Sequence, residues 1–267
     1  MNVDLLTVFS TDGTPIGVQR SGTGPPLVLV HGAVADHTRW APVLPALEQR
    51  ATVYALDRRG RGASGDSEPY AIEREFEDVA AVIDSIGGPV DVLGHSFGAF
   101  CTLEAARLTP NIRTIILYEP PPPGVPGTMP PGVAAEMQRR LQAGDRAGTV
   151  STFLVRVARL PPHELELLQS APSWPGRVAA AHTILREIQA LEALPTLAPE
   201  RFQAITAPTL LLLGGDSPPL YAENITALHG MLPNNRIAVL PGQQHVAMNT
   251  APELFVREVT GFLAAPA

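Results

Sequence analysis

The stretch "VLGHSFGAF" (residues 92–100) decides the fold. It contains the pattern G-x-S-x-G around Ser96, after an apolar run and before a helical pattern. In that context the pattern predicts a tight strand-to-helix turn that projects the serine hydroxyl above the carboxyl end of the strand. Glycines two residues to either side leave room where a Cβ would collide with backbone. The alternative is a glycine-bounded helix start that contains a serine; the flanking strand and helix favour a nucleophile.

Further strands and helices are predicted on both sides of this turn. Continuously apolar runs are typical of parallel strands that are covered on both faces. The predicted strands are residues 26–32, 52–57, 90–95, 114–119, 209–214 and 236–242. The helical patterns between them are residues 40–49, 73–86, 97–108, 220–231 and 252–263. This alternation predicts an α/β fold with a mostly parallel central sheet.

The alternation is interrupted after the fourth of these strands. The proline-rich stretch "EPPPPGVPGTMPPG" (residues 119–132) can form neither a helix interior nor a sheet interior, and we interpret it as a connector. Helical patterns follow it at residues 133–143, 146–160, 163–169 and 177–194. We therefore expect a core made of residues 1–119 and 208–267, with a helical insertion at 120–207.

Composition excludes several classes of function. The chain has 267 residues and a net charge of −7, which argues against nucleic-acid binding. All of its cations are arginines, so Schiff-base chemistry and a P-loop are excluded. We find no cysteine and histidine cluster with metal-ligand spacing and no G-x-G-x-x-G after a strand, so we expect neither a metal nor a dinucleotide cofactor.

The chain also lacks signals for export. Cys101 is the single cysteine, so the fold cannot depend on an internal disulfide. The first residues indicate a hairpin turning at Asp12 and Gly13 rather than a signal peptide. No apolar run approaches the roughly 20 residues of a membrane span. We expect a cytoplasmic protein that acts on a small molecule; the oligomeric state stays open.

A serine nucleophile requires a base, and His245 is the preferred one of seven histidines. It follows the last predicted strand in "LPGQQHVAMNTAPELF" (residues 240–255), where a loop can bring it over the sheet edge. After an earlier strand, residues 31–33 turn sharply toward a helix. The backbone N–H of Ala33 and that of Phe97 are predicted to form an oxyanion hole.

These motifs resemble those of the α/β-hydrolase superfamily in content and in order along nearly the whole chain. "HGA" (residues 31–33) is similar to the oxyanion turn, "LDRRGRGAS" (residues 56–64) to the superfamily's D-x-R-G-H-G-x-S loop, and "GQQHVAM" (residues 242–248) to the histidine loop. Arg61 is a departure, because that loop usually has histidine. Asp57 is interpreted as a residue that binds this turn. The resemblance implies a cap domain where the helical insertion lies.

The triad acid has two candidates. The resemblance implies an acid after the strand that follows the cap, but in "LGGDSPP" (residues 213–219) the matching slot is Ser217 and Asp216 comes one residue early. Some members of the superfamily place the acid after the neighbouring strand, where this chain has Glu119. We prefer Glu119 narrowly and keep Asp216 as its rival; the alternatives are helix capping for Asp216 and a strand-end acid for Glu119.

The predicted function is cofactor-independent hydrolysis of a carboxylic ester, lactone or thioester through an acyl-enzyme. We expect a small, largely apolar substrate beneath the insertion, and the candidate pocket residues are Trp40, Met129, Trp174 and Met248. Serine at the turn argues against the dehalogenases and epoxide hydrolases of the superfamily. One alternative is C–C bond hydrolysis, a lyase or an acyltransferase with the same residues. Another is a ligand-binding receptor with an idle triad.

Overall fold

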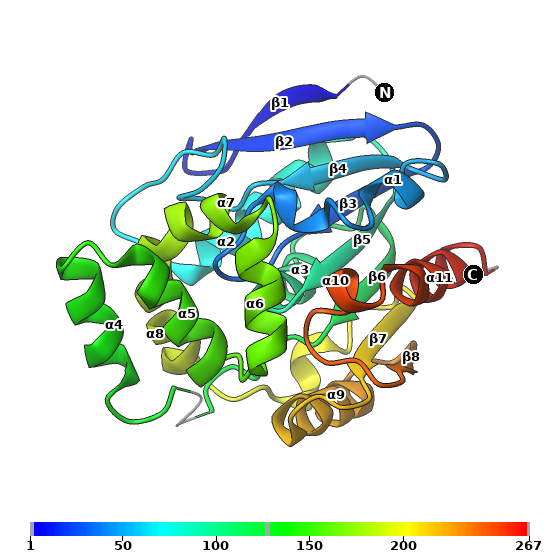
Figure 1. Ribbon diagram of the computed structural model, residues 1–267. Coiled ribbons are helices and arrows are strands. Elements are labelled where there is room, and N and C mark those ends of the chain that lie inside the picture. The colour runs from blue at the N-terminus through cyan, green and yellow to red at the C-terminus, as the bar shows by residue number, and fades with distance from the viewer. Residues whose placement is uncertain (1–2, 126–128, 266–267) are drawn as a thin grey trace.

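A central sheet organises the computed structural model of the chain, which describes residues 3–125 and 129–265 (Figure 1). Within these residues the sheet has eight strands in the order β1-β2-β4-β3-β5-β6-β7-β8. The strands are β1 (Asp4–Phe9), β2 (Pro15–Gly22), β3 (Pro26–Val30), β4 (Thr52–Leu56), β5 (Val90–His95), β6 (Ile112–Tyr118), β7 (Thr209–Gly214) and β8 (Asn235–Leu240).

The sheet is mostly parallel, as the sequence predicted. The pairs β3–β4, β3–β5, β5–β6, β6–β7 and β7–β8 are parallel, whereas β1–β2 and β2–β4 are antiparallel. β1 and β2 form the expected hairpin at residues 12–13. Parallel strands end at the same edge of the sheet, so the loops after β3, β5, β6, β7 and β8 gather there.

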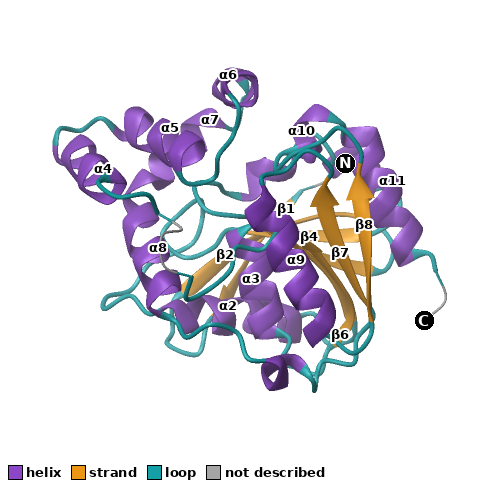
Figure 2. Cartoon of the chain, turned by 90° about the horizontal axis from the view of Figure 1, so that it is seen from below, coloured by secondary structure: helices purple, strands orange, loops and turns teal. Residues whose placement is uncertain are grey.

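Helices cover both faces of the sheet (Figure 2). α1 and α11 pack on one face, and α2, α3 and α9 pack on the other. The bounds of these helices and of the short α10 are α1 (Leu44–Leu47), α2 (Ile72–Ser85), α3 (Phe97–Ala105), α9 (Pro219–Met231), α10 (Ala247–Thr250) and α11 (Pro252–Leu263).

The first helix is much shorter than predicted. Residues 40–49 were expected to be helical, but they form the end of a 3₁₀ turn (His37–Trp40) and the four residues of α1. Pro42 and Pro45 explain the difference, because proline lacks the N–H that a helix interior requires. The other core helices lie within a few residues of their predicted positions.

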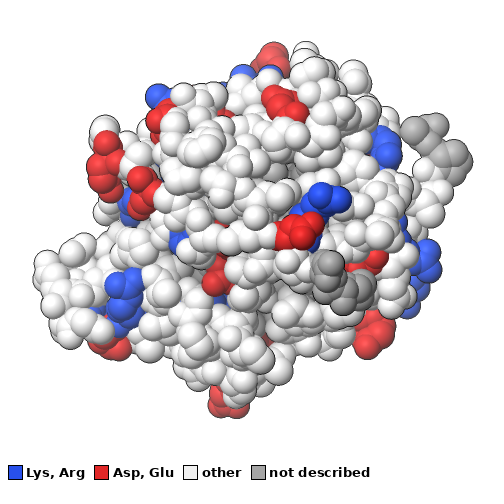
Figure 3. Space-filling view, turned by 90° about the horizontal axis from the view of Figure 1, so that it is seen from above, with Lys and Arg blue, Asp and Glu red and all other residues white. Residues whose placement is uncertain are grey.

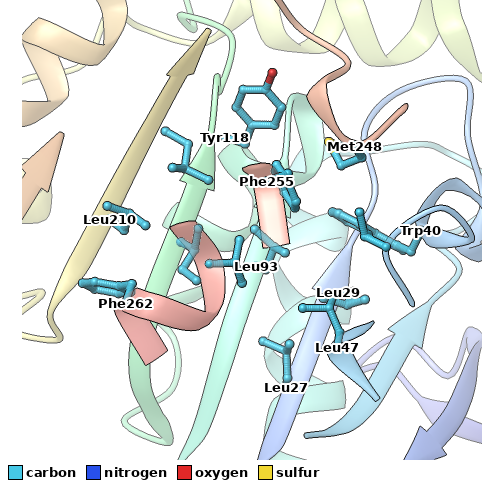
Figure 4. Packing of buried hydrophobic residues seen from close by; sticks show 14 of the residues in the cluster. Leu27, Leu29, Trp40, Leu47, Leu93, Tyr118, Leu210, Met248, Phe255 and Phe262 are labelled. Atoms are coloured by element: carbon cyan, nitrogen blue, oxygen red, sulfur yellow. The ribbon is translucent and has the colours of Figure 1, made fainter. Parts of the chain in front are cut away.

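Alternate side chains of the strands enter the two layers. Leu27 and Leu29 of β3 pack against α1 and α11, whereas Val28 and Val30 pack against α2 and α3. All four side chains are buried, which explains why the strand is apolar at every position. Figure 4 shows the first of these layers.

Five helices lie between β6 and β7, where the insertion was predicted. They are α4 (Val133–Gln142), α5 (Arg146–Arg156), α6 (Pro162–Ser170), α7 (Trp174–Ala179) and α8 (Ile184–Ala193), with short 3₁₀ turns at Ala180–Thr183 and Pro199–Phe202. Their apolar side chains, including Val150 and Ile184, form a cluster with Val34 and Val246 of the core. Figure 2 shows α5, α6 and α7 beyond the end of the sheet to which the arrows of β7 and β8 point.

The surface is mixed in charge on the face drawn in Figure 3. Acidic and basic side chains lie scattered there on a largely uncharged surface. In residues 3–125 and 129–265, no helix has both the length and the apolar composition needed to cross a membrane.

Candidate active site

Ser96 lies on a strained turn between β5 and α3. Its φ and ψ are 54° and −127°, a left-handed conformation that is rare for a residue with a side chain. Its backbone N–H donates to the carbonyl oxygen of Tyr118 on β6 at 2.8 Å. Gly98 is required here, because a Cβ would lie 2.3 Å from the carbonyl oxygen of His31. The turn therefore has the geometry that the motif predicted.

His245 and Glu119 lie in contact beside this turn. The Nδ1 atom of His245 is 2.6 Å from Oε2 of Glu119, and both side chains are buried. Glu119 follows β6 directly and has a φ of 45°. Its other oxygen, Oε1, accepts hydrogen bonds from Gly214 N at 2.7 Å and from Ser217 Oγ at 2.5 Å. With Nδ1 bonded to the carboxylate, Nε2 is the ring nitrogen left to accept a proton.

Asp216 does not reach His245. Its side chain is exposed, and among the described residues its carboxylate makes no hydrogen bond or ion pair. Its backbone N–H donates to the carbonyl oxygen of Gln243 at 2.9 Å, which joins the loop after β7 to the histidine loop. Ser217 occupies the slot of the expected acid, and its hydroxyl binds Glu119. Of the two candidate acids, the structure brings Glu119 and not Asp216 to the imidazole.

Three aromatic or imidazole side chains hold the histidine loop. The ring of Tyr221 stacks on that of His245, with centroids 4.6 Å apart. Tyr118 donates its hydroxyl to the carbonyl oxygen of Gln244. His95 donates from Nε2 to the carbonyl oxygen of His245 at 2.9 Å. Burial and the neighbouring His245 hold the pKa of His95 well below its ordinary value, so this ring is neutral. Sequence reasoning missed the roles of Tyr118 and Tyr221.

Ala33 and Phe97, the predicted oxyanion donors, lie beside Ser96 in the wall of one cavity. Gly32 makes this approach possible, because a Cβ there would be 2.9 Å from the Cβ of Ser96. Val34, the next residue along, has a φ of 45°, so the turn after β3 is strained as well. The two backbone segments therefore meet at the serine, as an oxyanion hole requires.

The cavity has two lobes that meet at Ser96. The apolar lobe has a volume of about 50 Å³, and the second, which we call the arginine lobe, has about 20 Å³, counted as the space open to the centre of a water-sized molecule. Both are lined by Ala33, Ser96, Phe153 and Ala158. The apolar lobe adds Phe97, Pro121, Pro122, Val157, Ile188, Leu191, Leu220 and Tyr221. The arginine lobe adds Arg39, His95, Leu154, Leu160, Leu168, Arg177, His245 and Val246.

The predicted pocket residues lie elsewhere. Trp40 and Met248 are completely buried in the core layer under α11, as Figure 4 shows. Met129 and Trp174 are partly buried and pack against the apolar cluster of the insertion. None of the four is among the described residues that line the two lobes. Sequence reasoning missed the lining residues of α5 and α8, because their apolar pattern also fits simple helix packing.

Two buried arginines give the arginine lobe its character. Arg39 and Arg177 are 2% and 4% exposed. Arg39 donates to the side-chain oxygen of Asn249, and Arg177 donates to the carbonyl oxygen of Val34 at 3.0 Å. Burial and the neighbouring Arg177 lower the pKa of Arg39 to about 9, and burial lowers that of Arg177 to about 10.

The group of Asp36, His37 and Asp57 could hold a metal, since it places three ligand atoms within 4.8 Å of one another. Its carboxylates are already engaged. Asp57 accepts from His37 N, from His37 Nδ1 and from Ala63 N, and Asp36 accepts from Thr38 N. These bonds close the turn, which agrees with a structural reading of Asp57. The hydrogen bond to Asp57 raises the pKa of His37.

Comparisons with known proteins agree with this architecture. Residues 27–258 match the model of the "Alpha/beta hydrolase family". The crystal structure of an alpha/beta hydrolase from Sphaerobacter thermophilus is similar, with a TM-score of 0.83, 38% identity and coverage of 97% of this chain and 100% of that one. The α/β-hydrolase fold that the resemblance implied is thereby confirmed.

Two curated relatives are hydrolases of different kinds. The 2-(acetamidomethylene)succinate hydrolase of Mesorhizobium japonicum is 23% identical over 94% of this chain and 92% of that protein. The pimeloyl-(acyl-carrier protein) methyl ester esterase of Aeromonas hydrophila is 26% identical over 93% of this chain and 99% of that protein. The relatives therefore agree on hydrolysis but differ in substrate.

Proposed function

The chain belongs to the alpha/beta hydrolase family, and on that premise we propose that it is a cofactor-independent serine hydrolase that cleaves a carboxylic ester through an acyl-enzyme. One observation carries the proposal. His245 is bonded through Nδ1 to a buried carboxylate and lines the same lobe as Ser96 on its strained turn. Nucleophile, base and orienting acid are thus available at one place.

In the first half of the reaction, the hydroxyl oxygen of Ser96 attacks the ester carbonyl while Nε2 of His245 accepts the hydroxyl proton. Glu119 stabilises the imidazolium that forms and fixes the ring by its bond to Nδ1. The N–H groups of Ala33 and Phe97 bind the oxyanion of the tetrahedral intermediate. Its collapse breaks the bond to the alcohol oxygen, which takes the proton back from Nε2.

In the second half, water attacks the acyl-enzyme and gives a proton to Nε2 of His245. The second tetrahedral intermediate uses the same two N–H donors. It collapses to the free acid, and the proton on Nε2 returns to Ser96. Water is therefore the only co-reactant that the reaction requires. The protein groups that transfer protons, Ser96 and His245, both belong to this chain.

The apolar lobe favours a small substrate with an apolar acyl part. Its wall is made mostly of alanine, proline, phenylalanine and branched aliphatic side chains. A relative is named as a methyl ester esterase, which is in line with a carboxylic ester. Lactones and thioesters require the same groups, as do C–C bond cleavage and acyl transfer, so these stay as alternative outcomes of the assay.

A fluorophosphonate probe tests the nucleophile. We expect a covalent adduct on Ser96 in the folded protein, together with turnover of short acyl esters. The Ser96→Ala variant should show neither, while its thermal unfolding stays cooperative. If the folded protein forms no adduct and hydrolyses no ester, the proposal fails.

The receptor alternative differs from the enzyme in what happens after binding. An idle triad would bind an apolar ester without releasing product. The contact between Glu119 and His245 favours the enzyme, because a histidine without an acid would be the expected sign of an idle site. Stoichiometric binding of the ester with no product after many hours would select the receptor.

A further inference from the structure

The two guanidinium groups of the arginine lobe are only partly paired with other groups of the protein. In the part of the chain that the structure describes, the Nε atoms of Arg39 and Arg177 and the Nη2 atom of Arg177 are buried and have no hydrogen-bond partner. Neither guanidinium forms an ion pair within 4.0 Å with any described carboxylate. A buried, uncompensated charge costs several kcal/mol, so two of them beside a nucleophile require an explanation.

The carboxylates nearby do not supply it. Asp36 acts electrostatically on Arg177, but it is bonded to the N–H and hydroxyl of Thr38. Glu164 of α6 acts electrostatically on Arg39, yet its Oε2 is itself buried without a partner among the described residues. Burial raises the pKa of Glu164, which reduces the negative charge available there. The two arginines thus share a wall with His95, which is a neutral ring, and with His245, the proposed base.

A carboxylate is the ligand whose chemistry fits. Guanidinium groups bind carboxylates through paired, charge-assisted hydrogen bonds. The lobe is small, at about 20 Å³ of space for the centre of a water-sized molecule, and Leu154, Leu160 and Leu168 are among the apolar side chains of its wall. The unpartnered nitrogen atoms are covered in this conformation, so the carboxylate reaches them through a rotation of the guanidinium groups.

The position of His245 decides which part of the ester enters this lobe. His245 lines the arginine lobe, and it is not among the residues lining the apolar lobe. The imidazole must protonate the leaving oxygen, so the alcohol part lies on the side of the histidine. The acyl part then occupies the apolar lobe, next to Phe97 and Tyr221.

We propose that Arg39 and Arg177 form a subsite for a carboxylate on the leaving-group side of the substrate. The preferred substrate class is then an apolar acyl group esterified to a short hydroxy acid. This inference rests on the proposed ester hydrolysis and adds a charge requirement that the apolar lobe alone does not predict.

Matched esters test the subsite. O-Butanoylglycolate and its neutral amide, O-butanoylglycolamide, differ only in the charge of the leaving group, and kcat/KM for each is measured by pH-stat titration. Charged hydrogen bonds contribute about 1.5–3 kcal/mol, so we expect the wild type to prefer the carboxylate by about 10- to 100-fold. Monoethyl succinate and ethyl butanoate form the second pair, with the charge on the acyl side, where we expect no preference.

The variants are Arg39→Gln, Arg177→Gln and Arg177→Lys. The readout is the ratio of kcat/KM for the glycolate ester to that for the glycolamide ester within each variant, so a general loss of folded protein cancels. We expect the ratio to fall close to one in both glutamine variants and to be intermediate in Arg177→Lys. Arg156→Gln is the matched control, since Arg156 is exposed on α5 and should leave the ratio unchanged.

Three results would overturn the inference: a ratio near one in the wild type, a wild-type ratio retained in both glutamine variants, or a preference for monoethyl succinate instead. Binding to Ser96→Ala, measured by calorimetry, separates this inference from the proposed function. If the wild type cleaves no ester but Ser96→Ala binds the glycolate ester at least about tenfold more tightly than the amide, the subsite stands and the ester hydrolysis fails. If it binds both equally, the subsite fails.

Discussion

Glu119 has three hydrogen-bond partners, which come from the end of β7, from the loop after it and from the histidine loop. Its carboxylate accepts from His245, from the hydroxyl of Ser217 and from the backbone N–H of Gly214. A carboxylate that accepts several hydrogen bonds is held in one orientation. A carboxylate in a fixed orientation is what the proposed imidazolium needs.

Replacing Glu119 by glutamine keeps the shape but removes the charge. By analogy with amide substitutions of a triad acid, we expect kcat on a short acyl ester to fall about 10³- to 10⁴-fold. Asp216→Asn is the matched control, and it should change kcat by less than about twofold because its carboxylate contacts no described residue. Equal losses in both variants, or a larger loss in Asp216→Asn, would contradict the assignment.

Ser217 donates its hydroxyl directly to the same carboxylate. Removing its hydroxyl in Ser217→Ala leaves Oε1 of Glu119 with one donor, Gly214 N. We expect kcat to fall by about tenfold, which corresponds to one hydrogen bond of roughly 1.4 kcal/mol, while KM changes little. Ser217→Thr, which restores a hydroxyl, should recover most of the rate; no recovery would indicate that the loop had moved instead.

The proposed nucleophile and the proposed base could both be selected from the sequence, because each lies in a motif next to a recognisable strand. The acid could not be decided, because Glu119 and Asp216 both follow strands that end at the same edge of the sheet. The choice depends on where the side chain of Glu119 points, and Glu119 has a positive φ of 45° that no local sequence pattern reveals. Arg39 and Arg177 were missed for a related reason: they are 138 positions apart in sequence and meet only through the insertion.

At the scale of elements, the insertion is joined to the core by buried charges. Glu187 of α8 accepts from Arg61 and lies 3.2 Å from Arg58, whose guanidinium also binds Glu75 at 2.8 Å. Burial acts to raise the pKa of Glu187, but the positive charges of Arg58 and Arg61 hold this pKa below its ordinary value. Arg61 stands where the superfamily's loop usually has histidine. Through Glu187 it anchors α8, the helix that lines the apolar lobe.

Removal of Glu187 leaves two buried arginines without their shared partner. We therefore expect Glu187→Ala to lower the free energy of unfolding by about 3–5 kcal/mol, measured by urea denaturation. Glu136→Ala, which removes an exposed i,i+4 pair on α4, is the control and should cost less than about 0.5 kcal/mol. A change of similar size in both variants would show that the buried cluster contributes no more than a surface pair.

Most element positions could be predicted, and the exceptions have local causes. The strands of the core lie within about two residues of their predicted ends, because each is a continuous apolar run bounded by Gly, Asp or Pro. The helix predicted at residues 177–194 is divided into α7, a 3₁₀ turn and α8. Its apolar periodicity continues through the division, since all three parts pack against the same cluster, so periodicity alone does not reveal it.

At the scale of the whole molecule, buried neutral histidines make stability depend on pH. Burial holds the pKa of His31 and that of His95 well below the ordinary value of 6.5. Below pH 6.5 the unfolded chain therefore binds protons that the folded chain does not, so stability falls as the pH falls. His37, whose pKa is raised by Asp57, acts in the opposite direction near neutral pH.

We expect the urea midpoint to decrease between pH 7 and pH 5, because the free energy of unfolding falls by up to about 1.4 kcal/mol per pH unit for each of His31 and His95. The His31→Gln variant should have a shallower dependence, even if it is less stable overall. A midpoint that is constant or rises over this interval, in the wild type, would contradict the neutral state of these two rings.

The adjacency of β5 and β6 limits which positions of the sequence can diverge in evolution. Ser96 and Glu119 directly follow these two strands, and the N–H of Ser96 is bonded to Tyr118, the residue before Glu119. The proposed nucleophile and the proposed acid therefore keep their spacing through one pair of strands. Among the described residues, the end of β7 and the loop after it give the carboxylate a backbone N–H and a hydroxyl, so an exposed side chain such as that of Asp216 can be replaced while this spacing is kept.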